Sequence, residues 1–134
     1  MKITIVVLGL IALSWMGHRA FAQTAAAEDY AYLARLHVPR VVVDCVAALD
    51  RWVHSAPRYD SVMVPDRRVL KAKVHSGSSI FSIANPIPID ASITMRAFAK
   101  LRGEYSWEPV RARCGVRHKA VNAVSLLPPA GEIH

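Results

Sequence analysis

The stretch that decides the fold is Ile93–Cys114, ITMRAFAKLRGEYSWEPVRARC, in which apolar and polar side chains alternate on both sides of Gly103-Glu104. Such alternation is typical of a strand with one buried face, and a short glycine-containing break between two such runs is typical of a hairpin. We therefore expect antiparallel strands over Ile93–Arg102 and Tyr105–Cys114. In the first strand, alternate side chains are expected to face inward: Met95, Ala97, Ala99 and Leu101. The side chains between them are expected to face outward: Arg96, Phe98, Lys100 and Arg102.

The second strand of this hairpin follows the same pattern. Its apolar positions should share the inward face and its arginines the outward face: Val110, Ala112 and Cys114 against Arg111 and Arg113. Pro109 is expected at a bulge or a sheet edge, because proline has no N–H to donate to a neighbouring strand. Gly115 or its neighbourhood is expected to form another turn, before a last strand over Ala120–Leu126.

The segment upstream of the hairpin also alternates with a period of two. Val69–His75 is therefore expected to be a strand, and Ile80–Ile83 a further short strand. Ser76–Ser79 between them has the composition of a turn. Asn85–Pro88 is expected to be a loop or an edge, because its two prolines would remove two hydrogen-bond donors from a central strand.

The first part of the domain is expected to be helical. Over residues 39–54, apolar side chains recur at spacings of three and four and form one stripe: Val42, Cys45, Val46, Leu49, Trp52 and Val53. This period predicts a helix with one buried face, and proline at residue 39 suits a first helical turn. Ala31–His37 is expected to form a short helix before it.

The chain has two cysteines, Cys45 and Cys114. In an exported protein, an even pair is most simply a disulfide, and the alternative is two free thiols. The predicted fold is therefore α+β: an N-terminal helical segment packed on an antiparallel sheet of four to five strands, stapled by one disulfide. Trp52 and Trp107 are expected to lie in the core near the bridge.

The N-terminal segment predicts export. Met1-Lys2 is a short basic start, Ile3–Leu13 is almost entirely apolar, and Ala20-Phe21-Ala22 matches a signal-peptidase site. This is the pattern of a secretory signal peptide. The apolar run is too short for a helix that spans a bilayer, which needs about 20 apolar residues. We expect a signal peptide over 1–22, a leader with a short helix over 23–38, one α+β domain over 39–127 and a tail over 128–134. The mature protein is expected to be periplasmic or secreted.

The 134-residue chain is basic, with a formal net charge of +7. Seven basic residues of the hairpin and the following turn are the candidate site: Arg96, Lys100, Arg102, Arg111, Arg113, Arg117 and Lys119. Further basic residues fall in one earlier segment: Arg67, Arg68, Lys71 and Lys73. Outward basic residues on neighbouring strands can merge into one positive face, which attracts anions. The alternative is a solvated basic surface without a specific partner.

Motifs for catalysis and for metal binding are absent from the sequence. No H-x-x-x-H, H-E-x-x-H, G-x-S-x-G, Walker or G-x-G-x-x-G pattern occurs, and we expect neither a metal nor a cofactor. The only acid–base pairing that the spacing suggests is Asp44 with His118, because each lies close to a cysteine. A small envelope hydrolase built on this pair is the enzymatic alternative.

Several short motifs resemble those of a known family. They are Cys45, Pro65-Asp66-Arg67, Ala97-Phe98, Arg102-Gly103, Trp107, Cys114 and the Val-rich segment Val121–Leu126. Over about residues 40–127 the chain resembles a small secreted alphaproteobacterial family of unknown function, which includes Brucella secreted protein C. The resemblance implies no catalytic residue. It implies a secreted protein that is delivered to a host or acts in the envelope.

Together these features favour a binding or interaction protein over an enzyme. We expect an outward basic sheet face that engages an anionic partner, which could be an acidic protein, a lipid or a glycan. Nucleic acid is not the expected target of a protein outside the cytoplasm. A secreted effector delivered to a host cell is the alternative that the family resemblance suggests.

Overall fold

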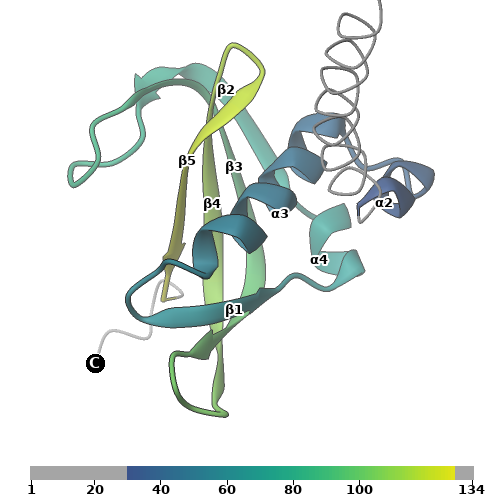
Figure 1. Ribbon diagram of the computed structural model, residues 1–134. Coiled ribbons are helices and arrows are strands. Elements are labelled where there is room, and N and C mark those ends of the chain that lie inside the picture. The colour runs from purple at the N-terminus through teal and green to yellow at the C-terminus, as the bar shows by residue number, and fades with distance from the viewer. Residues whose placement is uncertain (1–29, 129–134) are drawn as a thin grey trace, which may run out of the picture.

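The computed structural model describes residues 30–128, and Figure 1 shows their path. The expected signal peptide, the first part of the leader and the tail beyond residue 128 lie outside the described residues. The helices are α2 (Ala31–Arg35), α3 (Arg40–Val53) and α4 (Asp66–Leu70). The strands are β1 (Tyr59–Met63), β2 (Lys73–Ile80), β3 (Pro88–Leu101), β4 (Trp107–Arg117) and β5 (Ala120–Leu127).

The five strands form one antiparallel sheet in the order β1-β3-β4-β5, and β2 also pairs with β3. Strand β4 occupies one edge of β3 over Ala91–Lys100. Strands β1 and β2 share the other edge of β3, end to end, because β1 pairs with Phe98–Leu101 and β2 with Pro88–Thr94. The expected α+β architecture and the hairpin at Gly103-Glu104 are confirmed.

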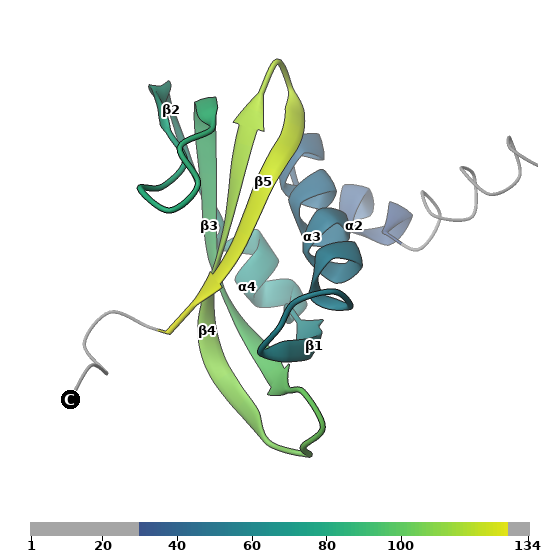
Figure 2. The same cartoon turned by 60° about the vertical axis from the view of Figure 1, so that its left-hand side comes forward.

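One face of the sheet is covered by helix, and the other face carries no helix among the described residues (Figure 2). The apolar stripe of α3 lies against the sheet through Val42, Cys45, Val46, Leu49 and Val53. The sheet contributes most of the side chains that the sequence predicted to face inward: Met95, Ala97, Ala99, Val110, Ala112 and Cys114. Leu101, also predicted to face inward, is only partly buried, and Ile93 is a further buried member. Leu33 of α2 and Val38 belong to the same core, which therefore begins before residue 39.

The disulfide joins the two layers of the fold. Cys45 of α3 and Cys114 of β4 are bonded, with their Cα atoms 5.9 Å apart. Both residues are fully buried, so the bridge crosses the middle of the core. The prediction of a Cys45–Cys114 bridge is confirmed, and the alternative of two free thiols is excluded.

A second, smaller core lies beside the first, around Gly115 of β4. Phe81, Ile89 and Ala123 are its buried members. A Cβ atom on Gly115 would lie 2.8 Å from both Phe81 Cδ2 and Ile89 Cγ2, so only glycine lets these side chains close over the strand. Gly115 itself therefore lies within β4, and the turn predicted at Gly115 or its neighbourhood falls at His118-Lys119, whose positive φ angles of 51° and 65° suit a tight hairpin turn.

The predicted strand Val69–His75 is wrong in its first half. Asp66–Leu70 is helix α4, in which the backbone N–H groups of Arg68 and Val69 donate to the carbonyl of Pro65. Val69 is buried in the core, and this contact overrides the local preference for an extended chain.

Three further expectations need correction. Ser76–Ser79 is not a turn but part of β2, where a register shift accommodates Gly77 at a φ of 141°. The expected strand Ile80–Ile83 is wrong, since β2 ends at Ile80. Trp107 is 47% exposed and is not a core residue, whereas Trp52 packs against the core. Strand β1 was not predicted.

The bridge provides the first testable prediction. A disulfide that closes a separation of 69 residues is expected to stabilise the folded state by about 4 kcal/mol, through the entropy of the unfolded chain. In urea titrations, the free energy of unfolding of the double variant Cys45→Ala/Cys114→Ala should be lower than that of the wild type by most of this amount. Addition of a reductant should lower the stability of the wild type and leave that of the variant unchanged. Equal stability of both proteins without reductant would contradict the role given to the bridge.

Candidate anion-binding site

A hollow lies where the edge of β3 has no neighbouring strand. Strand β1 ends with Met63 opposite Phe98, and β2 begins with Lys73 opposite Thr94. Between these pairs, β3 has no strand partner on this edge over residues 95–97. The chain between β1 and β2 leaves the sheet here to form α4, and the space that it leaves is a hollow of about 530 Å³.

The lining of the hollow is almost entirely basic. Its residues come from α4 and the segment after it, from β2, from β3 and from β4: Arg68, Lys71, Lys73, His75, Thr94, Met95, Arg96 and Arg111. No carboxylate lies among them. Five side chains with a permanent positive charge and one imidazole therefore face a volume in the range typical of ligand pockets, about 300–1,000 Å³.

The basic side chains of the hollow have no partners in the part of the protein that the structure describes. Among residues 30–128, no hydrogen bond or ion pair involves the side chain of Arg68, Lys71, Lys73 or His75. The same holds for Arg96 and Arg111, which stand directly opposite each other on β3 and β4. Like charges at directly opposed positions of a sheet destabilise it. The fold thus holds repelling cations together where an anion could neutralise them.

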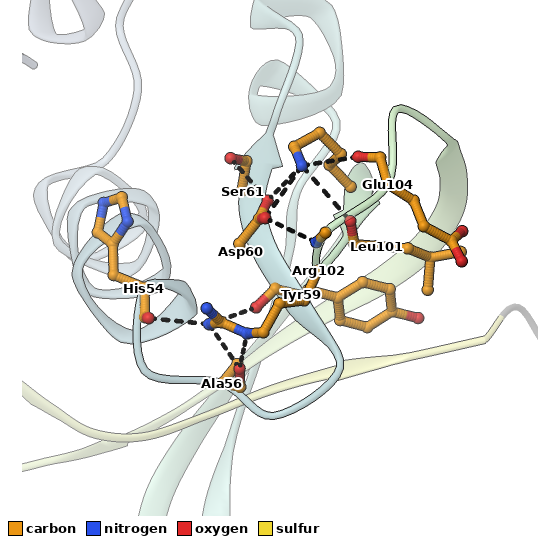
Figure 3. A network of polar contacts seen from close by, with 10 residues as sticks. His54, Ala56, Tyr59, Asp60, Ser61, Leu101, Arg102 and Glu104 are labelled. Atoms are coloured by element: carbon orange, nitrogen blue, oxygen red, sulfur yellow. Dashed lines mark hydrogen bonds and ion pairs between the residues drawn. The ribbon is translucent and has the colours of Figure 1, made fainter.

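Two of the other predicted residues have structural partners instead. The guanidinium of Arg102 donates to the carbonyls of His54, Ala56 and Tyr59 at 2.8–3.1 Å and ties the end of α3 to β1 (Figure 3). The ammonium of Lys100 lies 2.9 Å from the carboxylate of Asp60 and donates to the carbonyl of Glu104 at 2.8 Å. Both cations therefore stabilise the hairpin end of the sheet.

The remaining three predicted residues lie elsewhere. Arg113 donates to the carbonyl of Phe81, and its guanidinium lies 4.7 Å from the centre of the Phe81 ring. It therefore covers the smaller core. Arg117 and Lys119 are exposed at the turn between β4 and β5. Of the seven basic residues predicted as a site, the structure brings only Arg96 and Arg111 together in the hollow.

Four lining residues were not in the predicted site: Arg68, Lys71, Lys73 and His75. The basic run in their segment was visible in the sequence. The position of this segment beside β3 could not be predicted, because a strand was expected over Val69–His75. In the structure, helix α4 places Arg68 and Lys71 at the hollow. Recognition of Pro65-Asp66 as a helix start would have supplied the missing signal, since proline and an acidic residue are favoured in a first turn.

Two of the perturbed pKa values, those of Asp60 and Tyr59, occur at the opposite end of the sheet from the β4–β5 turn. The hydrogen bond from Lys100, more than any other contact, lowers the pKa of Asp60. This contribution to stability is present above the ordinary pKa of aspartate and is lost as the pH falls through the folded-state value. Burial, together with a 2.5 Å hydrogen bond to Glu108, raises the pKa of Tyr59 to about 12. These groups hold β1, β3 and β4 together.

The suggested acid–base pair is not assembled. Asp44 forms an ion pair with Arg40 at 3.2 Å, within the first turns of α3. The backbone N–H of His118 donates to Asp90, and no contact joins His118 to Asp44. Among residues 30–128, no three His, Cys, Asp or Glu side chains gather as metal ligands would. No helix in this part of the chain is long and apolar enough to cross a membrane.

Comparisons with known proteins identify no relative. No protein-family model, curated protein or solved structure matches the chain. The resemblance to the alphaproteobacterial family therefore stays a prediction.

The hydrogen bonds of Arg102 to backbone carbonyls give a second prediction. Replacement of Arg102 by alanine leaves three carbonyls without their donor, so we expect the free energy of unfolding to fall by about 2 kcal/mol. Arg117→Ala, which removes the same charge from an exposed turn, should change it by less than about 0.5 kcal/mol. Urea titrations of both variants provide the measurement. A loss of stability in Arg117→Ala as large as that in Arg102→Ala would refute the structural role of Arg102.

Proposed function

We propose that the protein is a small exported binding module that holds an anionic group, of the phosphate or sulfate class, in the hollow at residues 95–97 of β3. The observation that carries the proposal is the set of six basic side chains that line this hollow, none of which has a hydrogen-bond or ion-pair partner among residues 30–128. Unlike an exposed lysine on a smooth surface, these side chains come from four segments and face one volume.

The chemistry of the lining favours an oxyanion with several oxygen atoms. Arg68, Arg96 and Arg111 offer planar guanidinium groups, which match the geometry of phosphate and carboxylate oxygens in bidentate pairs. Lys71 and Lys73 add compact ammonium charges. Binding of an anion would remove the repulsion between Arg96 and Arg111, so the ligand would stabilise the fold as well as fill the hollow.

Export is the second part of the proposal and depends on the sequence. The segment Met1–Ala22 supports a periplasmic or secreted location. In that setting the anionic group could belong to an acidic protein, a lipid or a glycan. Delivery to a host cell is supported by the family resemblance only.

Inorganic pyrophosphate is a simple probe of the hollow. Isothermal titration calorimetry should show binding to the wild type, with an affinity that falls as salt rises, because the attraction is between charges. The double variant Arg96→Gln/Arg111→Gln should bind at least about tenfold more weakly, since each lost charge-assisted hydrogen bond contributes about 1.5–3 kcal/mol.

The matched control is Arg117→Gln/Lys119→Gln. It removes the same net charge from the β4–β5 turn, which lies outside the hollow. Its pyrophosphate affinity should stay within about twofold of the wild type, because screened charges at a distance contribute little. Equal losses of affinity in the two double variants would show a general effect of net charge and would overturn the proposed site.

A further inference from the structure

An apolar patch borders the hollow on the helix-free face of the sheet. We define it by Met63, Phe98, Trp107 and Leu127. Three of these side chains are about half exposed: Met63 at 51%, Trp107 at 47% and Leu127 at 50%. Large apolar side chains exposed together, beside polar or charged groups, mark sites of protein or membrane contact.

Strand register places the patch and the basic residues on the same face. Leu127 of β5 stands directly opposite Arg111 of β4, and directly opposed residues point to the same side of a sheet. Phe98 lies two residues from Arg96 along β3 and therefore shares its face. Met63 stands opposite Phe98, so the patch begins where the hollow ends.

The hairpin between β3 and β4 extends the patch beyond the edge of the sheet. Tyr105 is fully exposed in this hairpin, two residues before Trp107. Tyrosine and tryptophan are enriched at the boundary between water and lipid, because each has an apolar ring and a polar group. Two of the nearby carboxylates are already neutralised, since Asp60 is paired with Lys100 and Glu108 with Arg58. The exposed carboxylate of Glu104 has no such partner among residues 30–128.

We propose that the helix-free face docks on an anionic phospholipid bilayer. The hollow takes headgroup phosphates, and Met63, Trp107 and Leu127 enter the interfacial region of the lipid. The inference rests on the proposed function, because it requires the hollow to bind anions, and it names the partner. Charge complementarity supports a bilayer: surface cations each add to the attraction of an anionic leaflet, and the adjoining apolar side chains bury themselves in it.

The composition of the patch favours lipid over single-stranded nucleic acid. Sequence-tolerant binding of single strands depends on aromatic platforms that stack on successive bases. Met63 and Leu127 have no ring to stack, and the ring of Phe98 is half buried. Lipid contact requires only apolar area, which all four side chains of the patch supply.

Vesicle co-sedimentation of the full-length protein tests this inference. Wild type should bind vesicles of equimolar phosphatidylglycerol and phosphatidylcholine more tightly than vesicles of phosphatidylcholine alone. Arg96→Gln/Arg111→Gln should weaken binding to the anionic vesicles by about 30-fold, the effect expected for two cations at such a surface. Because Ile3–Leu13 is common to all variants, differences between variants report on the sheet face.

The apolar patch requires its own variant. Met63→Ser/Trp107→Ser should weaken binding to the anionic vesicles at least about tenfold, since each lost side chain removes apolar area from the lipid. The same variant should keep the pyrophosphate affinity of the wild type, which also shows that it is folded. The control Ile83→Ser removes an apolar side chain that is 95% exposed, more than either Met63 or Trp107, from the loop before β3, far from the β3–β4 hairpin. It should bind vesicles as the wild type does.

The outcomes separate this inference from the proposed function. Pyrophosphate binding without preference for anionic vesicles, or vesicle binding that Met63→Ser/Trp107→Ser leaves unchanged, would overturn docking on lipid and leave the anion site standing. Tighter binding to oligo-deoxythymidine than to the anionic vesicles would assign the face to nucleic acid instead. If the wild type bound neither pyrophosphate nor the anionic vesicles, the proposed function would be refuted as well.

Discussion

The burial of one face of β3 and β4 beneath α3 is the constraint on which the rest of the structure depends. Once the apolar stripe of α3 covers the inward side chains, and the Cys45–Cys114 bridge joins the two layers, every second residue of both strands must face the opposite side. Arg96 and Arg111 are therefore held outward and directly opposite each other. Neither residue can turn away without moving the core, so the repulsion between them is a consequence of the fold.

The hollow arises from a second constraint, the shared edge of β3. Strands β1 and β2 both pair with this edge but stop short of each other, and α4 takes the chain out of the sheet between them. The same excursion buries Val69 in the core and brings Arg68 and Lys71 to the gap. The burial of Val69 in the core thus also positions Arg68 and Lys71 in the basic lining of the hollow.

Local periodicity was enough to predict the two-layer fold. The alternation in Ile93–Cys114 and the three-and-four spacing of the helix predicted which side chains are buried, and the bridge was predicted from the pair of cysteines in an exported chain. The roles of the basic residues could not be predicted in this way. Lys100 and Arg102 alternate like Arg96, but their partners lie 40 and 46 residues away in the chain, so only the tertiary structure separates structural cations from those of the hollow. Strand β1 and helix α4 were missed because both are short and owe their form to contacts with β3 and the core.

The anion site on the helix-free face is proposed to consist of one defined set of cations. The most direct measurement is a titration of the ¹⁵N-labelled protein with inorganic pyrophosphate, followed by NMR of backbone amides and arginine side chains. We expect saturable shifts at the Nε–Hε groups of Arg96, Arg111 and Arg68 and at the amides of Lys71 and Lys73, while Arg102, Arg117 and Lys119 stay unchanged. Shifts centred on Arg117 and Lys119, or spread evenly over all basic residues, would contradict the proposed anion site.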